Sequence, residues 1–104
     1  MTMDNMQYVK KLLADAVAAG HVLKCHAEGD VDYIGTDVAK AFEAIEACDD
    51  EELTICAKDT MRQIAWVQIM QDATDPEEAI ADYSGFWMDV WWNENISEKI
   101  GDGK

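Results

Sequence analysis

Residues 63–71 read Gln-Ile-Ala-Trp-Val-Gln-Ile-Met-Gln, and apolar side chains occupy both odd and even positions of this stretch. Successive side chains of a β-strand point to opposite faces. As a strand, the stretch would carry Ala65, Val67 and Ile69 on one face and Ile64, Trp66 and Met70 on the other. Such a strand is typically central in its sheet or covered by helices on both faces. We therefore expect a fold built around a sheet.

The segments on either side show the helical and extended patterns that would complete such a sheet. Before the strand, apolar residues at three- and four-residue spacing predict helices over 4–19 and from 38 to about 48. Two-residue alternation predicts a hairpin over 21–34 and a strand over 53–58. The acidic run 49–52 is predicted to be a solvated connection. After the strand, Thr74, Asp75 and Pro76 are typical of a helix start. The pattern predicts a helix over 79–95 that bends at Ser84 and Gly85.

These elements predict an α+β fold in the order α-β-β-α-β-β-α, with an antiparallel four-stranded sheet and helices packed on it. The sequence contains no internal repeat and no linker, so residues 1–104 are expected to form a single domain. The last segment, 96–104, has two glycines and mixed charge and is predicted to be a flexible tail.

The chain is strongly acidic, with 22 Asp and Glu against 8 Lys and Arg in 104 residues, a net charge of −14. This charge argues against direct binding of nucleic acid or of an anionic membrane through a basic patch. No apolar run approaches the ~20 residues of a membrane span. Three cysteines without close spacing fit a reducing compartment, so a cytoplasmic location is expected.

No motif indicates a metal site or a catalytic site. The candidate ligands His21, Cys25, His26, Cys48 and Cys56 form no C-x-x-C pair and no helical histidine pair. The sequence leaves open a Cys-His catalytic pair among these residues, but no spacing specifies it. Glycine-rich phosphate loops and a G-x-S-x-G turn are absent from the sequence. We therefore expect no metal, no cofactor and no enzymatic activity.

Acidic residues concentrate in two stretches that contain few bases. Residues 28–52 contain ten acids and one base, Lys40, and residues 63–98 contain eight acids and no base. On a helix, carboxylates three or four positions apart lie about 5–6 Å from each other, a spacing comparable with that of DNA phosphates. The predicted acidic binding face consists of Glu43, Glu46, Asp49, Asp50, Glu51, Glu52, Asp72, Asp75, Glu77, Glu78 and Asp82.

The segment Phe86-Trp-Met-Asp-Val-Trp-Trp92 is apolar around more of a helix than one contact with a sheet requires. A docked surface helix needs an apolar stripe of roughly 100°, whereas these side chains cover more than twice that arc. The surplus must be covered by the first helix, by a second subunit or by a target protein. Aromatic residues and methionine are enriched at protein contacts, so Phe86, Met88 and Trp92 are the predicted aromatic contact residues.

In size, charge and α+β pattern the chain resembles small acidic accessory proteins of bacteriophages, several families of which inhibit DNA-handling enzymes by mimicking DNA. The segment Trp66-Val-Gln-Ile-Met-Gln-Asp72 is similar to a strand of the phage inhibitors of uracil-DNA glycosylase. It covers seven residues, and no site residue is carried over from it. The resemblance implies an inhibitor whose partner is a basic nucleic-acid-binding protein.

Two functions follow as expectations. The first is a non-enzymatic acidic binding protein of the phage type, which inhibits a nucleic-acid-handling host protein by mimicry of DNA charge. The alternative is a small homodimeric interaction or structural module whose acidity serves solubility.

Overall fold

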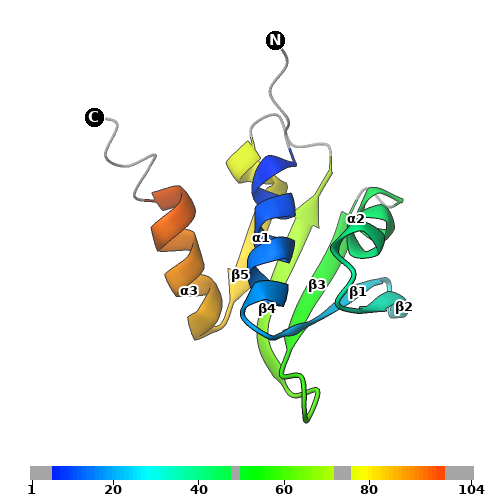
Figure 1. Ribbon diagram of the computed structural model, residues 1–104. Coiled ribbons are helices and arrows are strands. Elements are labelled where there is room, and N and C mark those ends of the chain that lie inside the picture. Colours follow the sequence, from blue (N-terminus) through cyan, green and yellow to red (C-terminus); the bar gives the residue numbers. More distant parts are fainter. Residues whose placement is uncertain (1–5, 48–49, 72–75, 98–104) are drawn as a thin grey trace.

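The computed structural model describes residues 6–47, 50–71 and 76–97 (Figure 1). Its helices are α1 (Gln7–Ala18), α2 (Val38–Glu46) and α3 (Phe86–Trp92), with a 3-10 turn at Pro76–Ala79 and a π-helical turn at Asn93–Ser97. Its strands are β1 (Val22–Ala27), β2 (Asp30–Gly35), β3 (Asp50–Cys56), β4 (Gln63–Met70) and β5 (Ile80–Ser84).

The strands form one antiparallel sheet in the spatial order β2-β1-β3-β4-β5. The β1–β2 hairpin turns at Glu28 and Gly29, which both adopt positive φ angles of 52° and 87°. Two successive residues with positive φ are the geometry of a type I′ turn, whose twist matches that of paired strands. The hairpin predicted over 21–34 is therefore present.

All three helices pack on one face of the sheet and share a single apolar core with it. Figure 1 shows α1 across the middle of the sheet, α2 over β1 and β2, and α3 at the β5 side. Burial alternates clearly along β4, where Val67 and Ile69 face the core, and Leu53 and Ile55 of β3 face the same core; all four are at most 1% exposed. Helical spacing places Val9, Leu12, Leu13 and Ala16 of α1 against them.

The α+β class and the antiparallel sheet are confirmed, but the four-stranded sheet and the order α-β-β-α-β-β-α are wrong in detail. Residues 80–84, predicted to be helical, form the fifth strand, β5, which pairs with β4. Before β5 is added, β4 has a free edge of backbone donors and acceptors, and pairing satisfies them. The helix begins only at Phe86, after Gly85 turns the chain with a φ of 105°. The predicted bend at Ser84 and Gly85 is this junction.

Two other boundaries also differ from those expected. The acidic run was predicted to be a connection, but β3 begins at Asp50 and includes Glu51 and Glu52. Ile96, assigned to the predicted tail, is 1% exposed and belongs to the core. The helix start expected at residues 74 and 75, and the tail residues 98–104, lie outside the described residues.

None of the described helices is long and apolar enough to cross a membrane.

Candidate protein-binding surfaces

The face of the sheet opposite the helices carries side chains from every strand. The paired strands align two rows, which read from β2 to β5 as Val31, His26, Glu52, Gln68, Asp82 and as Ile34, Lys24, Thr54, Trp66, Ser84. Asp50 and Met70 form a further pair on the same face. We call these twelve residues the open face, because the described helices all pack on the other side of the sheet.

Hydrogen bonds between neighbouring strands fix the side chains of the open face. The Trp66 indole Nε1 donates to Glu52 Oε1 at 2.8 Å, and Gln68 Nε2 donates to Asp50 Oδ1 at 3.1 Å. On the β1 side, His26 Nε2 and Thr54 Oγ1 are 2.8 Å apart. Side chains held in this way lose little further freedom when a partner binds, which lowers the entropic cost of binding.

The open face also exposes apolar groups. Val31 and Ile34 of the edge strand β2 are each 50% exposed, and Trp66 and Met70 of β4 are half-buried. Trp66 and Met70 of the second apolar face predicted for residues 63–71 therefore lie on the open face, which no described helix covers, whereas Ile64 packs against the core. β4 has β3 and β5 on its two sides, so the prediction of a strand inside the sheet is confirmed.

The residues of the predicted acidic face lie in several places. Asp50, Glu52 and Asp82 lie on the open face, and Glu43 and Glu46 are exposed on α2. Gln71 Nε2 donates to the Glu46 carbonyl at 3.0 Å, which brings the end of α2 to the end of β4, where Asp50 pairs with Met70. Glu78 is exposed in the 3-10 turn, and Glu77 belongs to the same turn. Asp49, Asp72 and Asp75 lie outside the described residues.

Glu51 differs from the other acids of the predicted face, because it is 0% exposed. Side chains alternate along β3, so Asp50 and Glu52 point to the open face and Glu51 points to the core. Its inclusion in a solvent-exposed acidic face is corrected accordingly. Burial, reinforced by the negative charges of Glu51 and Asp32, raises the pKa of the Cys25 thiol to about 12.

The three predicted aromatic contact residues also differ in their exposure to solvent. Phe86 is 81% exposed, whereas Met88 is 0% exposed and packs in the core. Trp92 is half-buried, with its ring 5.2 Å from that of Tyr83 on β5. Met88 is thus covered by the chain itself, because α3 turns this side towards the sheet. The surplus apolar surface of α3 is carried by Phe86 and by Val90, which is 38% exposed.

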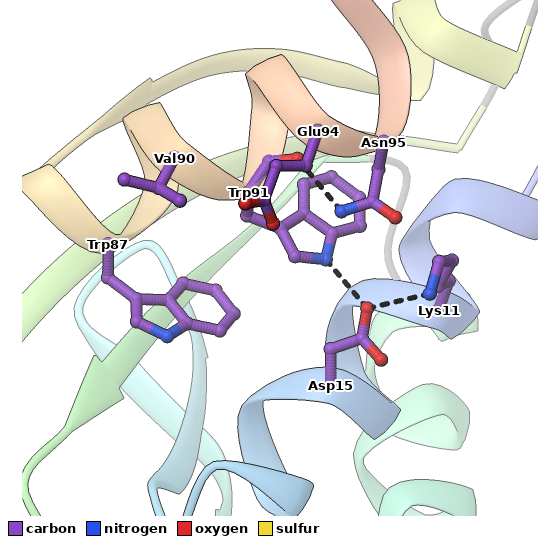
Figure 2. A pocket seen from close by; sticks show the side chains of 7 residues that line it. All are labelled: Lys11, Asp15, Trp87, Val90, Trp91, Glu94 and Asn95. Atoms are coloured by element: carbon purple, nitrogen blue, oxygen red, sulfur yellow. Dashed lines mark hydrogen bonds and ion pairs between the residues drawn. The ribbon is translucent and has the colours of Figure 1, made fainter. Parts of the chain in front are cut away.

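A groove of about 290 Å³ lies between α1 and α3 in the helix layer (Figure 2). Trp87, Val90, Trp91 and Glu94 line it from α3 and the turn that follows, and Lys11 and Asp15 line it from α1. Trp91 Nε1 and Lys11 Nζ both donate to Asp15 Oδ2, each at 2.9 Å. This groove joins residues 76 positions apart in the chain.

Among the described residues, the geometry offers little support for a catalytic pair of cysteine and histidine; Cys48 lies outside them. Cys25 faces the core, where its Sγ lies 3.7 Å from the Ala41 carbonyl, while the adjacent His26 faces the open side. A nucleophilic cysteine needs a lowered pKa, and burial raises the pKa of both Cys25 and Cys56. Within residues 6–47, 50–71 and 76–97, no three His, Cys, Asp or Glu side chains gather as metal ligands would.

Sequence reasoning identified Asp50, Glu52 and Asp82 but not the apolar and aromatic groups beside them. The alternation of residues 63–71 placed Trp66 on a second apolar face and was the signal that could have found it. The groove had no such signal, since it depends on how α1 and α3 meet in space.

No protein-family model, curated protein or solved structure matched this chain.

Proposed function

We propose that this protein is a non-enzymatic binding protein whose open face contacts a basic nucleic-acid-binding protein and competes with DNA for it. The observation that carries the proposal is the second apolar face of β4, which no described helix covers and which carboxylates surround. A sheet face that is only solvated is usually polar, whereas Trp66, Met70, Val31 and Ile34 are apolar.

Charge favours a basic partner. Asp50, Glu52 and Asp82 flank Trp66 and Gln68 on the open face, and the whole chain carries −14. Such a field accelerates association with a positively charged surface and repels acidic ones. Trp66 would supply the buried contact at the centre of the interface, and the carboxylates would face Lys and Arg of the partner.

The competition with DNA is supported by the density of negative charge. Glu43 and Glu46 lie one helical turn apart on α2, and the bond from Gln71 brings Glu46 to the corner of the sheet that holds Asp50. Carboxylates so arranged resemble a line of phosphates to a groove that binds DNA. We propose the bacterial cytoplasm as the setting, since Cys25 and Cys56 are free thiols.

Affinity capture with the immobilised protein tests this proposal. A nucleic-acid-binding protein captured from a bacterial lysate at low salt should be released by duplex DNA and by raised salt. The variant Asp50→Asn/Glu52→Gln/Asp82→Asn should capture about tenfold less of it, given a loss of about 0.5 kcal/mol for each of the three charge pairs. The substitutions keep the hydrogen-bond acceptors for Trp66 and Gln68.

A matched control separates the open face from net charge. The variant Glu28→Gln/Asp30→Asn/Asp59→Asn removes the same three charges at exposed positions, so its capture should stay near that of the wild type. If both variants captured equally less of the partner protein, the loss would be due to net charge alone, which would contradict a binding site on the open face. Capture that duplex DNA does not displace would contradict the mimicry.

Exposed Phe86 favours the second candidate, a homodimer. At 81% exposure this ring presents an apolar contact that a second copy could cover. The expected test is light scattering of the wild type and of Phe86→Ser at equal concentration. A dimer that Phe86→Ser converts to the 11.6 kDa monomer would support this candidate, and a wild-type monomer would remove it.

A further inference from the structure

We propose that the groove between α1 and α3 is a second binding site, which takes the guanidinium group of an arginine side chain from a basic polypeptide. The site is separate from the open face because it lies in the helix layer, on the other side of the sheet. The inference goes beyond the proposed function, and neither depends on the other.

The floor of the groove is held in place by a shared carboxylate oxygen. Asp15 Oδ2 accepts hydrogen bonds from Trp91 Nε1 and Lys11 Nζ, so the indole of Trp91 and the side chain of Lys11 are both anchored (Figure 2). Asn95 Nδ2 also donates to the Trp91 carbonyl at 2.9 Å, which ties the π-helical turn to α3. A site on two helices with these ties is formed before a ligand arrives.

Aromatic and aliphatic groups form the walls. Trp87 is half-buried, and its ring meets that of His21 edge to face, with centroids 5.8 Å apart. Val90 is 38% exposed beside it. The faces of indole rings attract cations, and arginine stacks on them more readily than lysine because its planar guanidinium is weakly hydrated.

The carboxylates of the groove favour a positively charged ligand. The charge of Lys11 is matched by Asp15, its partner in an ion pair, which leaves the exposed carboxylate of Glu94 at the rim. An incoming guanidinium would find the Glu94 carboxylate to pair with and the half-buried indole of Trp87 beside it. The net charge of −14 favours such a cation over an anion that Lys11 alone could attract.

The size of the groove fits one side chain. Its volume of about 290 Å³ is at the lower end of the range of roughly 300–1,000 Å³ for sites that hold whole small molecules. One arginine of an extended basic segment is therefore a better match than a large cofactor.

The four tryptophan indole N–H signals in a ¹H–¹⁵N correlation spectrum provide the test. The probe is Nα-acetyl-arginine amide, and its uncharged citrulline analogue is the control ligand. The arginine probe should move the signals of Trp87 and Trp91 in a saturable way, and those of Trp66 and Trp92 should stay in place. Binding of the citrulline analogue should be weaker by about fivefold or more.

Matched variants of equal charge complete the experiment. Glu94→Gln should weaken binding of the arginine probe by about two- to fivefold, whereas Glu28→Gln, exposed in the β1–β2 turn, should leave it unchanged. Trp87→Leu should abolish the shift of the Trp91 signal while the other backbone signals keep their dispersion, which reports that the variant is folded. Equal binding of both probes, equal effects of the two glutamine variants or shifts confined to Trp66 would each overturn the proposal.

Discussion

At the scale of single residues, Gly85 decides where β5 ends and α3 begins. Its φ of 105° is a conformation that side-chain-bearing residues rarely adopt, and a Cβ there would lie 2.5 Å from the Ile64 carbonyl oxygen and 2.9 Å from Ala65 Cα. Both atoms belong to β4, which cannot move without disturbing the sheet. The close approach of the two backbones explains why a glycine occupies this junction.

Gly85→Ala should therefore lower the free energy of unfolding by about 2–4 kcal/mol, through backbone strain and overpacking together. Gly20→Ala is the matched control, because Gly20 has a φ of 90° but no atom within 4 Å of the place that an alanine methyl group would occupy. It should cost only about 1–2 kcal/mol. Urea denaturation of both variants measures the difference, and equal losses would show that the contact with β4 is unimportant.

The Cys25 thiol predicts a loss of stability at high pH. Burial, together with Glu51 and Asp32, raises its pKa from 9.0 to about 12, so between these values the unfolded chain has lost a proton that the folded chain keeps. Below pH 9 the thiol is protonated in both states and has no effect on the pH dependence. Above it, the free energy of unfolding should fall by about 1.4 kcal/mol per pH unit.

Cys25→Ala removes this titration and serves as the comparison. The slope of unfolding free energy against pH, measured by urea denaturation from about pH 9 upward, should be less steep in the variant by the equivalent of one proton. Other groups titrate alike in both proteins, so the difference isolates Cys25. Identical slopes would mean that the thiol ionises as easily in the folded protein as in the unfolded chain.

At the scale of elements, α3 depends on α1 for its position. The bond from Trp91 Nε1 to Asp15 Oδ2 joins the two helices at a half-buried site, whereas the ion pair of Lys11 with Asp15 lies within α1 at a more exposed one. A hydrogen bond to a charged group away from water contributes more than an exposed pair between neighbouring turns.

A pair of double-mutant cycles tests this ranking. The cycle of Trp91→Phe with Asp15→Ala should give a coupling energy of about 1–2 kcal/mol, and the cycle of Lys11→Ala with Asp15→Ala about 0.3–0.5 kcal/mol. Thermal or urea unfolding of the single and double variants supplies both values. A larger coupling for Lys11 would contradict the view that the Trp91 bond holds α3 on α1.

The elements also show how far local patterns reach. Helices α1 and α2 and strands β1 to β4 follow from spacing and turn residues, because each satisfies its own periodicity. Strand β5 could not be predicted in this way, because Ile80–Ser84 is short and forms a strand only by pairing with the free edge of β4. The prediction that the acidic residues 50–52 form a loop was wrong for a related reason. Their charge is typical of a solvated connection, but they pair with β4 and therefore belong to strand β3.

At the scale of the whole molecule, net charge opposes folding and self-association. A body carrying −14 repels itself, and the repulsion is strongest where salt is low. The same field would favour a positively charged partner on either of the two proposed surfaces. Charge thus links stability, oligomeric state and binding.

Thermal unfolding in NaCl should reveal this repulsion. Raising the salt from about 20 mM to about 500 mM should increase Tm by about 5 °C or more, because screening weakens repulsion among the acids. The variant Glu28→Gln/Asp30→Asn/Asp59→Asn should start from a higher Tm and respond less to salt. A Tm that falls with salt would indicate that attractive ion pairs dominate instead.

The sequence alone determined the α+β class, the hairpin, most element positions, the acidity and the second apolar face of residues 63–71, because these depend on local periodicity and composition. Only the tertiary structure decided the features that depend on contacts between residues far apart in the sequence. Residues 80–84 form a strand because they pair with the free edge of β4. The pairing of β3 with β4 places Glu51 in the core and Glu52 on the open face. The packing of α3 buries Met88 and leaves Phe86 exposed. The groove exists only because Trp91 meets Asp15 across 76 positions of chain, and a contact between such distant residues is specified by the whole fold.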